Sequence, residues 1–542
     1  MILSLNFNHD GSGVILNQGH IAAYVNTERF SRIKKHPGLR EEDLDELFRQ
    51  AGATIDDISF VILCNHGINY PEFLEAFGDK YTDVPFDYKL SPDFKRVEMR
   101  GRTIDCAYNP DHFLCHAAAS YYFSPFNSAL TFAYDPMGSG AYIGVENRLS
   151  PFPLPVTRVG AIYSEISRAI GFGGLFGAGK TMGLAPLGKA AAGLTPALLE
   201  FAQNPLRVDD ITPVIEEILD LAAKREIIVK GHKGKSWNAA SAYIVQEFLE
   251  TVLKHVLEQL FRANQRNKMA GKLAANPNLC LSGGTALNSV ANEKVFRASN
   301  FSNFYAHPAC GDDGTSIGAA LYWWHHVLGH PKIPRQNSEA MYSVASYSST
   351  SIKDAIRSFE NRVESWSSTD YIAETAQYIS EGKIVGWFNG ASEIGPRALG
   401  NRSILADPRR ADMCDKLNKK VKHRESFRPF APSVLLEDAQ GWFDAVESPY
   451  MLRVVRVKSR EIPAVDHFGS ARIQTVSAQD NSSYHALIKE FKDITGVPAV
   501  LNTSFNVGFE PIVETPEDAL KTFVDSELDY LVFPGIIVKK AP

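Results

Sequence analysis

The chain has 542 residues, of which 44% are hydrophobic and 22% are charged, with a formal net charge of -6 at pH 7. These values are ordinary for a globular protein, and the length favours two domains over one. The negative net charge argues against a nucleic-acid-binding protein, and no apolar run reaches the length of a membrane-spanning helix. We therefore expect a cytoplasmic protein without a nucleic-acid or membrane partner.

Six cysteines are scattered along the chain without a C-x-x-C pair or a regular spacing. This distribution predicts free thiols in a reducing cytosol, because structural disulfides belong to oxidising compartments. The first residues, MILSLNFNHDG, contain neither a basic segment nor a long apolar core. They therefore lack the features of a signal peptide.

Short apolar runs along the first half of the chain predict strands. Three lie within the first thirty residues, at 2–7, 12–17 and 20–28, with a turn at NQG where glycine adopts a positive φ easily. Two more, at 129–135 and 278–284, end in polar or glycine residues and precede a turn or a helix. This order predicts an α/β fold whose functional residues gather at strand ends.

The polar, aperiodic stretch 336–351 predicts a domain boundary, which divides the chain into domains 1–345 and 346–542. The second domain continues with helices, strands and loops and ends in a predicted strand at 528–533. We find no internal repeat and no low-complexity tract in the sequence.

The stretch GGLFGAGKTMGLAPLG contains a match to the phosphate-binding pattern G-x-x-x-x-G-K-[ST]. The match is formed by Gly174, Gly179, Lys180 and Thr181. A true P-loop follows a buried strand, so that backbone N–H groups surround a phosphate at a helix N-terminus. Here isoleucines recur at every fourth position from Ile162 to Ile170, which predicts a helix instead. A P-loop NTPase remains an alternative that this context disfavours.

The motif DHFLCH places His112 and His116 one helical turn apart on the same face. An isolated H-x-x-x-H is more often a pair of surface histidines, but two carboxylates strengthen the metal interpretation. Asp135 closes the predicted strand 129–135, and Asp312 lies in CGDDGTSIG before a predicted helix. Two imidazoles and carboxylates from separate strand ends suit Fe(II), Mn(II) or Zn(II) with positions open to a substrate.

Two further turns carry small polar residues after predicted strands. LSGGTALN contains Gly283, Gly284 and Asn288, and LNTSFN contains Asn502, Ser504 and Asn506. Glycines between a strand and a helix let the backbone approach a phosphate, and small polar side chains at a strand end suit a nucleotide. Both stretches are equally compatible with ordinary packing turns.

The stretch 395–430 is strongly basic, with ten lysines or arginines and four acids in a chain of net negative charge. Such a segment indicates a local anion site, a solvated helix face or an RNA-binding patch. RNA is the weaker interpretation because aromatic residues that could stack on bases are sparse there. Arginines beside glycine and proline, as in GPR and FRP, favour fixed loops that grip a phosphate.

These stretches occur together in the order seen in the bacterial O-carbamoyltransferases, which the chain resembles over nearly its whole length. The motifs are NHDGSG, NTERFSRIKK, H-x-x-x-H, GKTMGLAPLG, SGGTALN, GDDG, GPRALGNRSI, KHRESFRPFAPS and LNTSFN. The family includes nodulation, cephamycin and tobramycin carbamoyltransferases. The resemblance implies an N-terminal actin/Hsp70-like (ASKHA) domain and a C-terminal YrdC-like α/β domain. It also implies that the P-loop match is accidental.

The resemblance implies an activity in two steps. Carbamoyl phosphate and ATP, with Mg(II), would give carbamoyl-AMP in the YrdC-like domain. The carbamoyl group would then pass at the metal site to a hydroxyl of a small-molecule natural product, such as an antibiotic, a polyketide or a saxitoxin-type alkaloid. A tRNA threonylcarbamoylation-type enzyme and an actin-like NTPase or regulatory protein are alternatives, and a homodimer is possible.

The resemblance also assigns residues to each step. The implied metal ligands are His112, His116, Asp135 and Asp312, and His9 is the implied base for the acceptor hydroxyl. The implied carbamoyl-phosphate ligands are Arg397, Lys422 and Arg428, with Arg424 as a neighbour. The implied nucleotide ligands are Gly283, Gly284, Asn288, Asn502, Ser504 and Asn506. Two departures from the family pattern are PMGSG after Asp135 and the absence of an acid before the glycine–lysine pair at 179–180.

Overall fold

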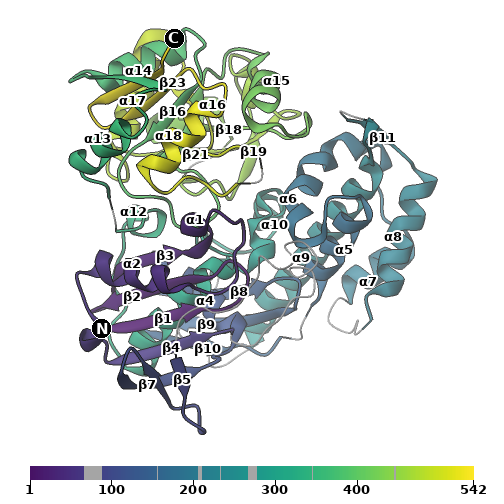
Figure 1. Cartoon of the computed structure of the whole chain (residues 1–542). Helices are drawn as coiled ribbons and strands as arrows, with labels where there is room; N and C mark the ends of the chain where they lie inside the picture. Colours follow the sequence, from purple (N-terminus) through teal and green to yellow (C-terminus); the bar gives the residue numbers. More distant parts are fainter. Residues whose placement is uncertain are drawn as a thin grey trace.

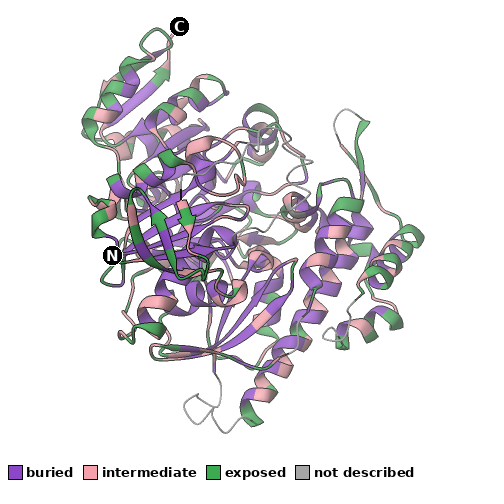
Figure 2. Ribbon diagram, turned by 60° about the horizontal axis from the view of Figure 1, so that its bottom comes forward, coloured by how far each residue is buried: buried purple, intermediate pink, exposed green. Residues whose placement is uncertain are grey.

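A computed structural model describes residues 1–65, 88–154, 157–204, 210–231, 234–266, 277–344, 346–444, 447–508 and 510–542. Its elements form three large sheets with helices packed against them, which confirms the predicted α/β class. Figure 1 shows two sheets from the first half of the chain below a third sheet from the second half. In Figure 2 the strands at the centre are almost wholly buried, whereas many helices have one buried and one exposed face.

The first sheet has the strand order β3-β2-β1-β4-β7-β6-β5. Its strands are β1 (Ile2–Asn6), β2 (Ser12–Asn17), β3 (His20–Asn26), β4 (Phe60–Cys64), β5 (Tyr88–Leu90), β6 (Arg96–Met99) and β7 (Arg102–Tyr108). The three strands predicted in the first thirty residues are confirmed. The third strand ends earlier than predicted, because the Asn26 side chain accepts a hydrogen bond from the Glu28 N–H and caps helix α1 (Thr27–Ser31).

The second sheet has the order β10-β9-β8-β13-β14 and repeats the topology of the first. Its strands are β8 (Ser128–Tyr134), β9 (Ser139–Val145), β10 (Arg148–Pro151), β13 (Asn278–Ser282) and β14 (Phe304–Ala306). In both sheets three consecutive strands pair antiparallel and the first of them pairs parallel with a later strand. The structure thus contains a duplicated sheet topology that the sequence did not reveal. This duplicated topology is the one expected of an actin/Hsp70-like domain.

Two helices pack between these sheets. Helix α4 (His112–Phe123) packs on the second sheet, helix α11 (Thr315–Tyr322) packs on the first, and the two pack against each other. Gly318 allows this contact, since a Cβ atom there would lie 1.8 Å from the Cys115 carbonyl oxygen. The contact fixes the spacing between the two histidines of α4 and Asp312, which lies just before α11.

The rest of the first half of the chain is mainly helical. Its other helices and strands are α2 (Glu41–Ala51), α5 (Val159–Ala169), α6 (Gly174–Leu184), α7 (Pro196–Gln203), α8 (Thr212–Lys224), β11 (Ile228–Lys230), β12 (Ser236–Asn238), α9 (Ala239–Arg266), α10 (Ser289–Arg297) and α12 (Asn337–Met341). The helix predicted before the P-loop-like motif is α5, and the motif itself forms helix α6. The P-loop alternative is therefore wrong, because a strand and a phosphate-binding loop are both missing at this place.

The third sheet has the order β15-β24-β23-β16-β17-β22-β18-β21. Its strands are β15 (Val363–Ser367), β16 (Val385–Phe388), β17 (Arg402–Ala406), β18 (Ala431–Leu435), β21 (Gln474–Val476), β22 (Ala499–Ser504), β23 (Tyr530–Phe533) and β24 (Ile536–Lys540). A hairpin of β19 (Val454–Arg456) and β20 (Ser470–Arg472) lies beside it. The helices are α13 (Ser349–Arg357), α14 (Tyr371–Ser380), α15 (Met413–Leu417), α16 (Ala439–Trp442), α17 (Ser482–Thr495) and α18 (Pro516–Val524).

Two details of this half differ from the sequence analysis. The predicted last strand is β23, but β24 follows it and completes the sheet. The stretch 336–351 contains helix α12 and the start of α13, so it is less irregular than its composition indicated. The boundary at residue 345 and the YrdC-like assignment of the C-terminal domain remain predictions. All six cysteines are free thiols. No helix formed by the described residues combines the length and apolar character needed to cross a bilayer.

Candidate active site

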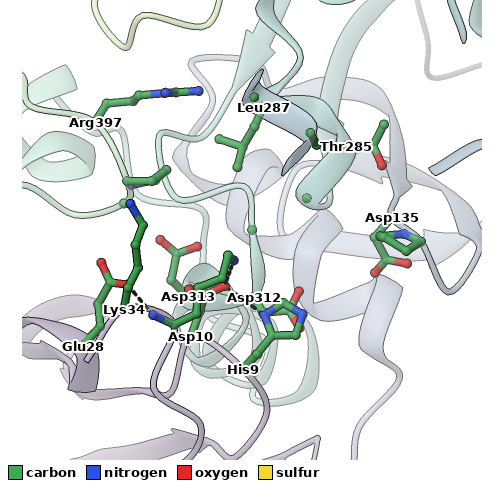
Figure 3. Close-up of a pocket in the computed structure, with 18 of the residues that line it drawn as sticks. His9, Asp10, Glu28, Lys34, Asp135, Thr285, Leu287, Asp312, Asp313 and Arg397 are labelled. Carbon is green, nitrogen blue, oxygen red and sulfur yellow. Dashed lines mark hydrogen bonds and ion pairs between the residues drawn. The ribbon is translucent and has the colours of Figure 1, made fainter. Parts of the chain in front are cut away.

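A cavity of about 240 Å³ lies between the strand ends of the N-terminal sheets and the C-terminal domain. His9, Asp135 and Asp312 line one side of it, whereas Arg397 and Ser504 line another. In Figure 3 His9 lies beside Asp312, with Asp135 further along the same side, and Arg397 projects from the opposite side. Residues predicted for the two chemical steps therefore face one shared space.

Four predicted metal ligands converge in the N-terminal domain. Ligand atoms of His112, His116, Asp135 and Asp312 all lie within 4.8 Å of one another. His112 Nε2 is 2.6 Å from an Asp135 oxygen and 3.2 Å from the His116 Nε2. His116 Nε2 is 3.4 Å from an oxygen of Asp312. His116, Asp135 and Asp312 are buried, and His112 is nearly so, which makes the cluster part of the interior rather than a pair of surface histidines.

Three of the four cluster members are also held from their other side, whereas the buried Nδ1 of His116 has no hydrogen-bond partner among the described residues. His112 Nδ1 is 2.9 Å from the amide oxygen of Asn65, and donation there leaves Nε2 directed at the cluster. One Asp135 oxygen accepts hydrogen bonds from two backbone N–H groups, at 2.6 and 3.2 Å. One Asp312 oxygen accepts from the side chain of Asn8 at 2.6 Å. Such outer contacts orient ligands before a metal arrives.

The charges of the cluster fit a divalent cation. Burial lowers the pKa of His112, but the hydrogen bond with Asp135 and the charges of Asp312 and Asp135 raise it to about 9. The pKa of Asp312 is lowered in spite of its burial, by His9, His116 and His112. Two imidazole nitrogens only 3.2 Å apart need a shared proton or a cation between them. Two nitrogen and two oxygen donors suit Fe(II), Mn(II) or Zn(II), and the donor types do not choose among these ions.

His9 lies beside this cluster and is held by residues that the sequence analysis did not select. Its Nε2 is 3.4 Å from Asp312, and its Nδ1 is 2.8 Å from an oxygen of Asp10. Lys35 contacts the same Asp10 oxygen at 2.5 Å. Although burial opposes it, the charges of Lys35 and His9 lower the pKa of Asp10 to about 2. An ionised Asp10 that accepts a hydrogen bond from Nδ1–H favours the tautomer with the lone pair on His9 Nε2, and that lone pair can accept a proton.

The predicted carbamoyl-phosphate ligands lie on the C-terminal side. Lys422 is buried, and its ammonium group donates to Ser504 and to two oxygens of Asn506, at 2.7 and 3.0 Å. Arg397 lines the cavity, and its Nε is buried without a hydrogen-bond partner among the described residues. The loop that carries Arg397 is held from the N-terminal domain, because Arg29 donates to the Gly395 carbonyl at 2.7 Å.

More cations gather here than the sequence analysis selected. Burial and the charges of Arg397, Arg424 and Arg428 lower the pKa of Arg472, whose Nε also lacks a partner among the described residues. Burial and the charge of Arg428 lower the pKa of Arg424 to about 9. Lys34, which lines the cavity, has a pKa lowered by burial and by Arg428. Mutual repulsion among buried cations is what an anion would relieve.

The predicted nucleotide ligands fall into two groups. Gly284, Asn288, Ser504 and Asn506 line the cavity. Gly283 instead packs against β8, since a Cβ atom there would lie 2.2 Å from the Tyr134 carbonyl oxygen. Asn502 is buried and donates to neighbouring groups of the third sheet, including Ser433 and Gln474. The Asn288 side chain caps α10 and exchanges hydrogen bonds with Gln246. The nucleotide-binding roles of all six residues remain predictions.

Comparison with known proteins identifies the family. Residues 71–321 match the family Carbamoyltransferase N-terminus, and residues 376–540 match Carbamoyltransferase C-terminus. The chain is 33% identical to the nodulation protein NolNO of Sinorhizobium fredii, over 98% of this chain and 79% of that protein. The chain belongs to the carbamoyltransferase family. The resemblance found in the sequence is thereby confirmed, and the protein is a carbamoyltransferase.

A second relative carries a more specific name. This carbamoyltransferase is 32% identical to the 3'-hydroxymethylcephem-O-carbamoyltransferase of Amycolatopsis lactamdurans, over 60% of this chain and 61% of that protein. Solved structures are more distant. Component A of the (R)-2-hydroxyglutaryl-CoA dehydratase of Acidaminococcus fermentans covers 60% of this chain and 98% of its own, with 14% identity and a TM-score of 0.31. A likeness of that size carries no argument about function.

Proposed function

We propose that this carbamoyltransferase makes carbamoyl-AMP from carbamoyl phosphate and ATP and transfers the carbamoyl group to a hydroxyl of a small molecule. The observation that carries the proposal is the shared cavity: Arg397 and Lys34 line one side of it, and Asp135 and Asp312 of the histidine–aspartate cluster line the other. A relative named for O-carbamoylation of a hydroxymethyl group supports a hydroxyl acceptor.

The first step belongs to the C-terminal side in this proposal. With one water, carbamoyl phosphate and ATP give carbamoyl-AMP, phosphate and pyrophosphate, all in the presence of Mg(II). Arg397, Lys422 and Arg428 would hold the anions, with Arg424 and Arg472 adding positive charge. Guanidinium groups grip phosphate oxygens in pairs, and their effect is strong where water is excluded.

The second step belongs to the histidine–aspartate side. The acceptor oxygen attacks the carbamoyl carbon, the bond between that carbon and the adenylate oxygen breaks, and AMP leaves. His9 would take the hydroxyl proton at Nε2, while Asp10 holds its Nδ1. A metal ion held by His112, His116, Asp135 and Asp312 would supply positive charge for the departing phosphate. Keeping both steps in one cavity protects the intermediate from hydrolysis.

The proposal is tested by separating the two steps. Protein, Mg(II), ATP and carbamoyl phosphate are mixed without an acceptor, and pyrophosphate is measured against a reaction that lacks carbamoyl phosphate. We expect release that depends on carbamoyl phosphate. A panel of hydroxylated natural products is then screened by mass spectrometry for the gain of one carbamoyl group. If pyrophosphate is not released above the control, the adenylate scheme is wrong.

A further inference from the structure

The P-loop-like motif lies outside the two-step scheme above, although its residues lie next to the basic loop of the C-terminal domain. Lys180 is on helix α6 of the N-terminal domain, 3.1 Å from Glu425. The other Glu425 oxygen is 3.7 Å from the guanidinium of Arg428. A chain of charges therefore runs from the GKT motif to a predicted carbamoyl-phosphate ligand.

The same loop is anchored to the N-terminal domain by an aromatic side chain. Phe427 is buried, and its ring centroid is 5.8 Å from that of Phe172 and 5.3 Å from that of Trp237. Phe172 lies between α5 and α6, and Trp237 is in β12. Phe427 thus belongs to the hydrophobic core of the N-terminal domain, although its neighbour Arg428 belongs to the C-terminal anion site.

Helix α6 carries Lys180 and packs beside this loop. The buried Thr181 hydroxyl donates to the Ser167 hydroxyl of α5 at 2.8 Å, which ties α6 to its neighbour. The Lys180 ammonium lies 5.7 Å from the Phe172 ring centroid, over the same ring that contacts Phe427. Gly183, one turn further on, faces Pro429 of the loop: a Cβ atom there would lie 3.5 Å from the proline ring, at ordinary contact distance.

Glu425 has an unusual place for a carboxylate, because it lies within a site that must attract anions. Burial raises its pKa, but a backbone hydrogen bond at Glu425 itself, followed by the contacts with Lys180 and Arg428, outweighs burial and lowers it. An ionised Glu425 without Lys180 would repel a phosphate and would draw the Arg428 guanidinium toward itself. With Lys180 present, the negative charge is balanced from the N-terminal side and Arg428 remains available to a ligand.

We propose that Lys180 of the GKT motif is a positioning residue for the first half-reaction, acting from the N-terminal domain through Glu425 on Arg428. This inference rests on the proposed function of the C-terminal anion site. It means that the anion site is complete only when helix α6 and the loop 422–430 are docked. Lys180 therefore supports carbamoyl-phosphate binding indirectly. A P-loop lysine, by contrast, would contact a nucleotide phosphate itself.

The test measures both half-reactions in Lys180→Ala and Lys180→Arg. We expect Lys180→Ala to raise the KM for carbamoyl phosphate in pyrophosphate release by about tenfold, the typical effect of losing a charge-assisted contact of about 1.4 kcal/mol. The KM for ATP and the rate of transfer from supplied carbamoyl-AMP should not change. Lys180→Arg should restore most of the loss, because it keeps the charge next to Glu425.

Matched variants separate this role from a general effect on folding. Lys189→Ala removes an exposed lysine that follows a glycine in the same region and should behave as the wild type. Glu425→Gln keeps the shape of the side chain and removes its charge. In the Lys180→Ala/Glu425→Gln double variant the repelling carboxylate is gone, so we expect the KM for carbamoyl phosphate to be lower than in Lys180→Ala alone.

Several outcomes would overturn the inference. They are an unchanged KM for carbamoyl phosphate in Lys180→Ala, an effect confined to the KM for ATP, and an equal loss in both half-reactions. Calorimetric titration with inorganic phosphate provides a measurement that does not need turnover, and phosphate should bind Lys180→Ala about tenfold more weakly. If the wild type releases no pyrophosphate, the proposed function fails, and the phosphate titration still decides the role of Lys180.

Discussion

The two sides of the cavity are prepared for their ligands in opposite ways. In the histidine–aspartate cluster, hydrogen bonds hold His112, Asp135 and Asp312 from behind and leave their remaining atoms aimed at a common point. On the basic side, Arg397 and Arg472 keep buried nitrogens without partners among the described residues. The first side pairs opposite charges, whereas the second also brings like charges together, and an anion bound between them would relieve their repulsion.

This difference predicts how each side affects the stability of the folded protein before its ligand binds. A cluster with balanced charges is compatible with a stable fold before its ion binds. Crowded cations destabilise the folded state until an anion neutralises them, and functional sites often carry such a cost. The following predictions would break or sharpen this contrast.

The largest effect is expected from His116→Ala. His116 contacts both His112 and Asp312, so its loss removes one ligand and leaves two charged neighbours without their partner. Metal content should fall well below one ion per chain and carbamoylated product should vanish, while pyrophosphate release persists. Element analysis and the two activity assays check this. His255→Ala, a half-buried histidine of helix α9, is the control and should keep metal and product. Retained metal with retained product in His116→Ala would contradict the metal assignment.

Asp10→Asn should slow transfer from supplied carbamoyl-AMP by roughly 10²–10⁴-fold, as expected when a carboxylate that orients a catalytic histidine is lost. The amide can donate a hydrogen to His9 Nδ1 and so favours the tautomer that lacks a lone pair at Nε2. Pyrophosphate release should be unchanged, because Asp10 lies on the histidine–aspartate side. Rapid-mixing assays of each step measure the two rates. A transfer rate equal to that of the wild type would show that Asp10 does not orient the base.

Arg397→Ala should lower pyrophosphate release by roughly 10–100-fold in kcat/KM for carbamoyl phosphate, since a charged contact contributes ~1.5–3 kcal/mol. Transfer from supplied carbamoyl-AMP should be spared. Arg410→Ala is the matched control, because Arg410 belongs to the same basic stretch and its side chain is about half exposed. Normal turnover of carbamoyl phosphate by Arg397→Ala would show that the assignment of this arginine is wrong.

The smallest effects are expected from ligands alone. Inorganic phosphate at about a hundred times its Kd should stabilise the wild type by about 2.7 kcal/mol, and a chelator should destabilise it. Thermal unfolding measures both shifts. Arg397→Ala should lose half or more of the phosphate shift and keep the chelator shift, whereas His116→Ala should keep the phosphate shift and lose the chelator shift. If both variants lose both shifts, the two sides are not independent sites and the contrast drawn here fails.

The histidine–aspartate cluster was predictable from local rules. A four-residue spacing on a helix places His112 and His116 on one face, and α/β folds bring strand ends such as Asp135 into one place. The basic side was predictable only as a stretch of sequence. Arg472 is far from that stretch and reaches it through β20, and Lys34 reaches it from the N-terminal domain. Tertiary contacts of this kind have no signal in composition or spacing.

The fold shows the same division. Strands with strong apolar runs were found, and the end of β3 was misplaced because Asn26 acts as a helix cap. The duplicated sheets were invisible because topology can repeat without similar residues. Gly283 and Asn502 were selected by their motifs, yet their contacts are with β8 and with the third sheet. A motif identifies a turn, but it does not tell which of its side chains face the cavity.

The close contact of α4 with α11 has a kinetic consequence. The histidines come from α4 and Asp312 from the segment before α11, and Gly318 leaves no space between the two helices. Residues packed at this density move only when the core opens locally, on a slower timescale than side-chain rotation. Because Asp135 and Asp312 also line the cavity, a metal ion held across this contact would leave through the cavity, and the tightly packed helices would slow its loss by keeping the four ligands in place. Its loss to a chelator should become independent of chelator concentration once the chelator is in excess.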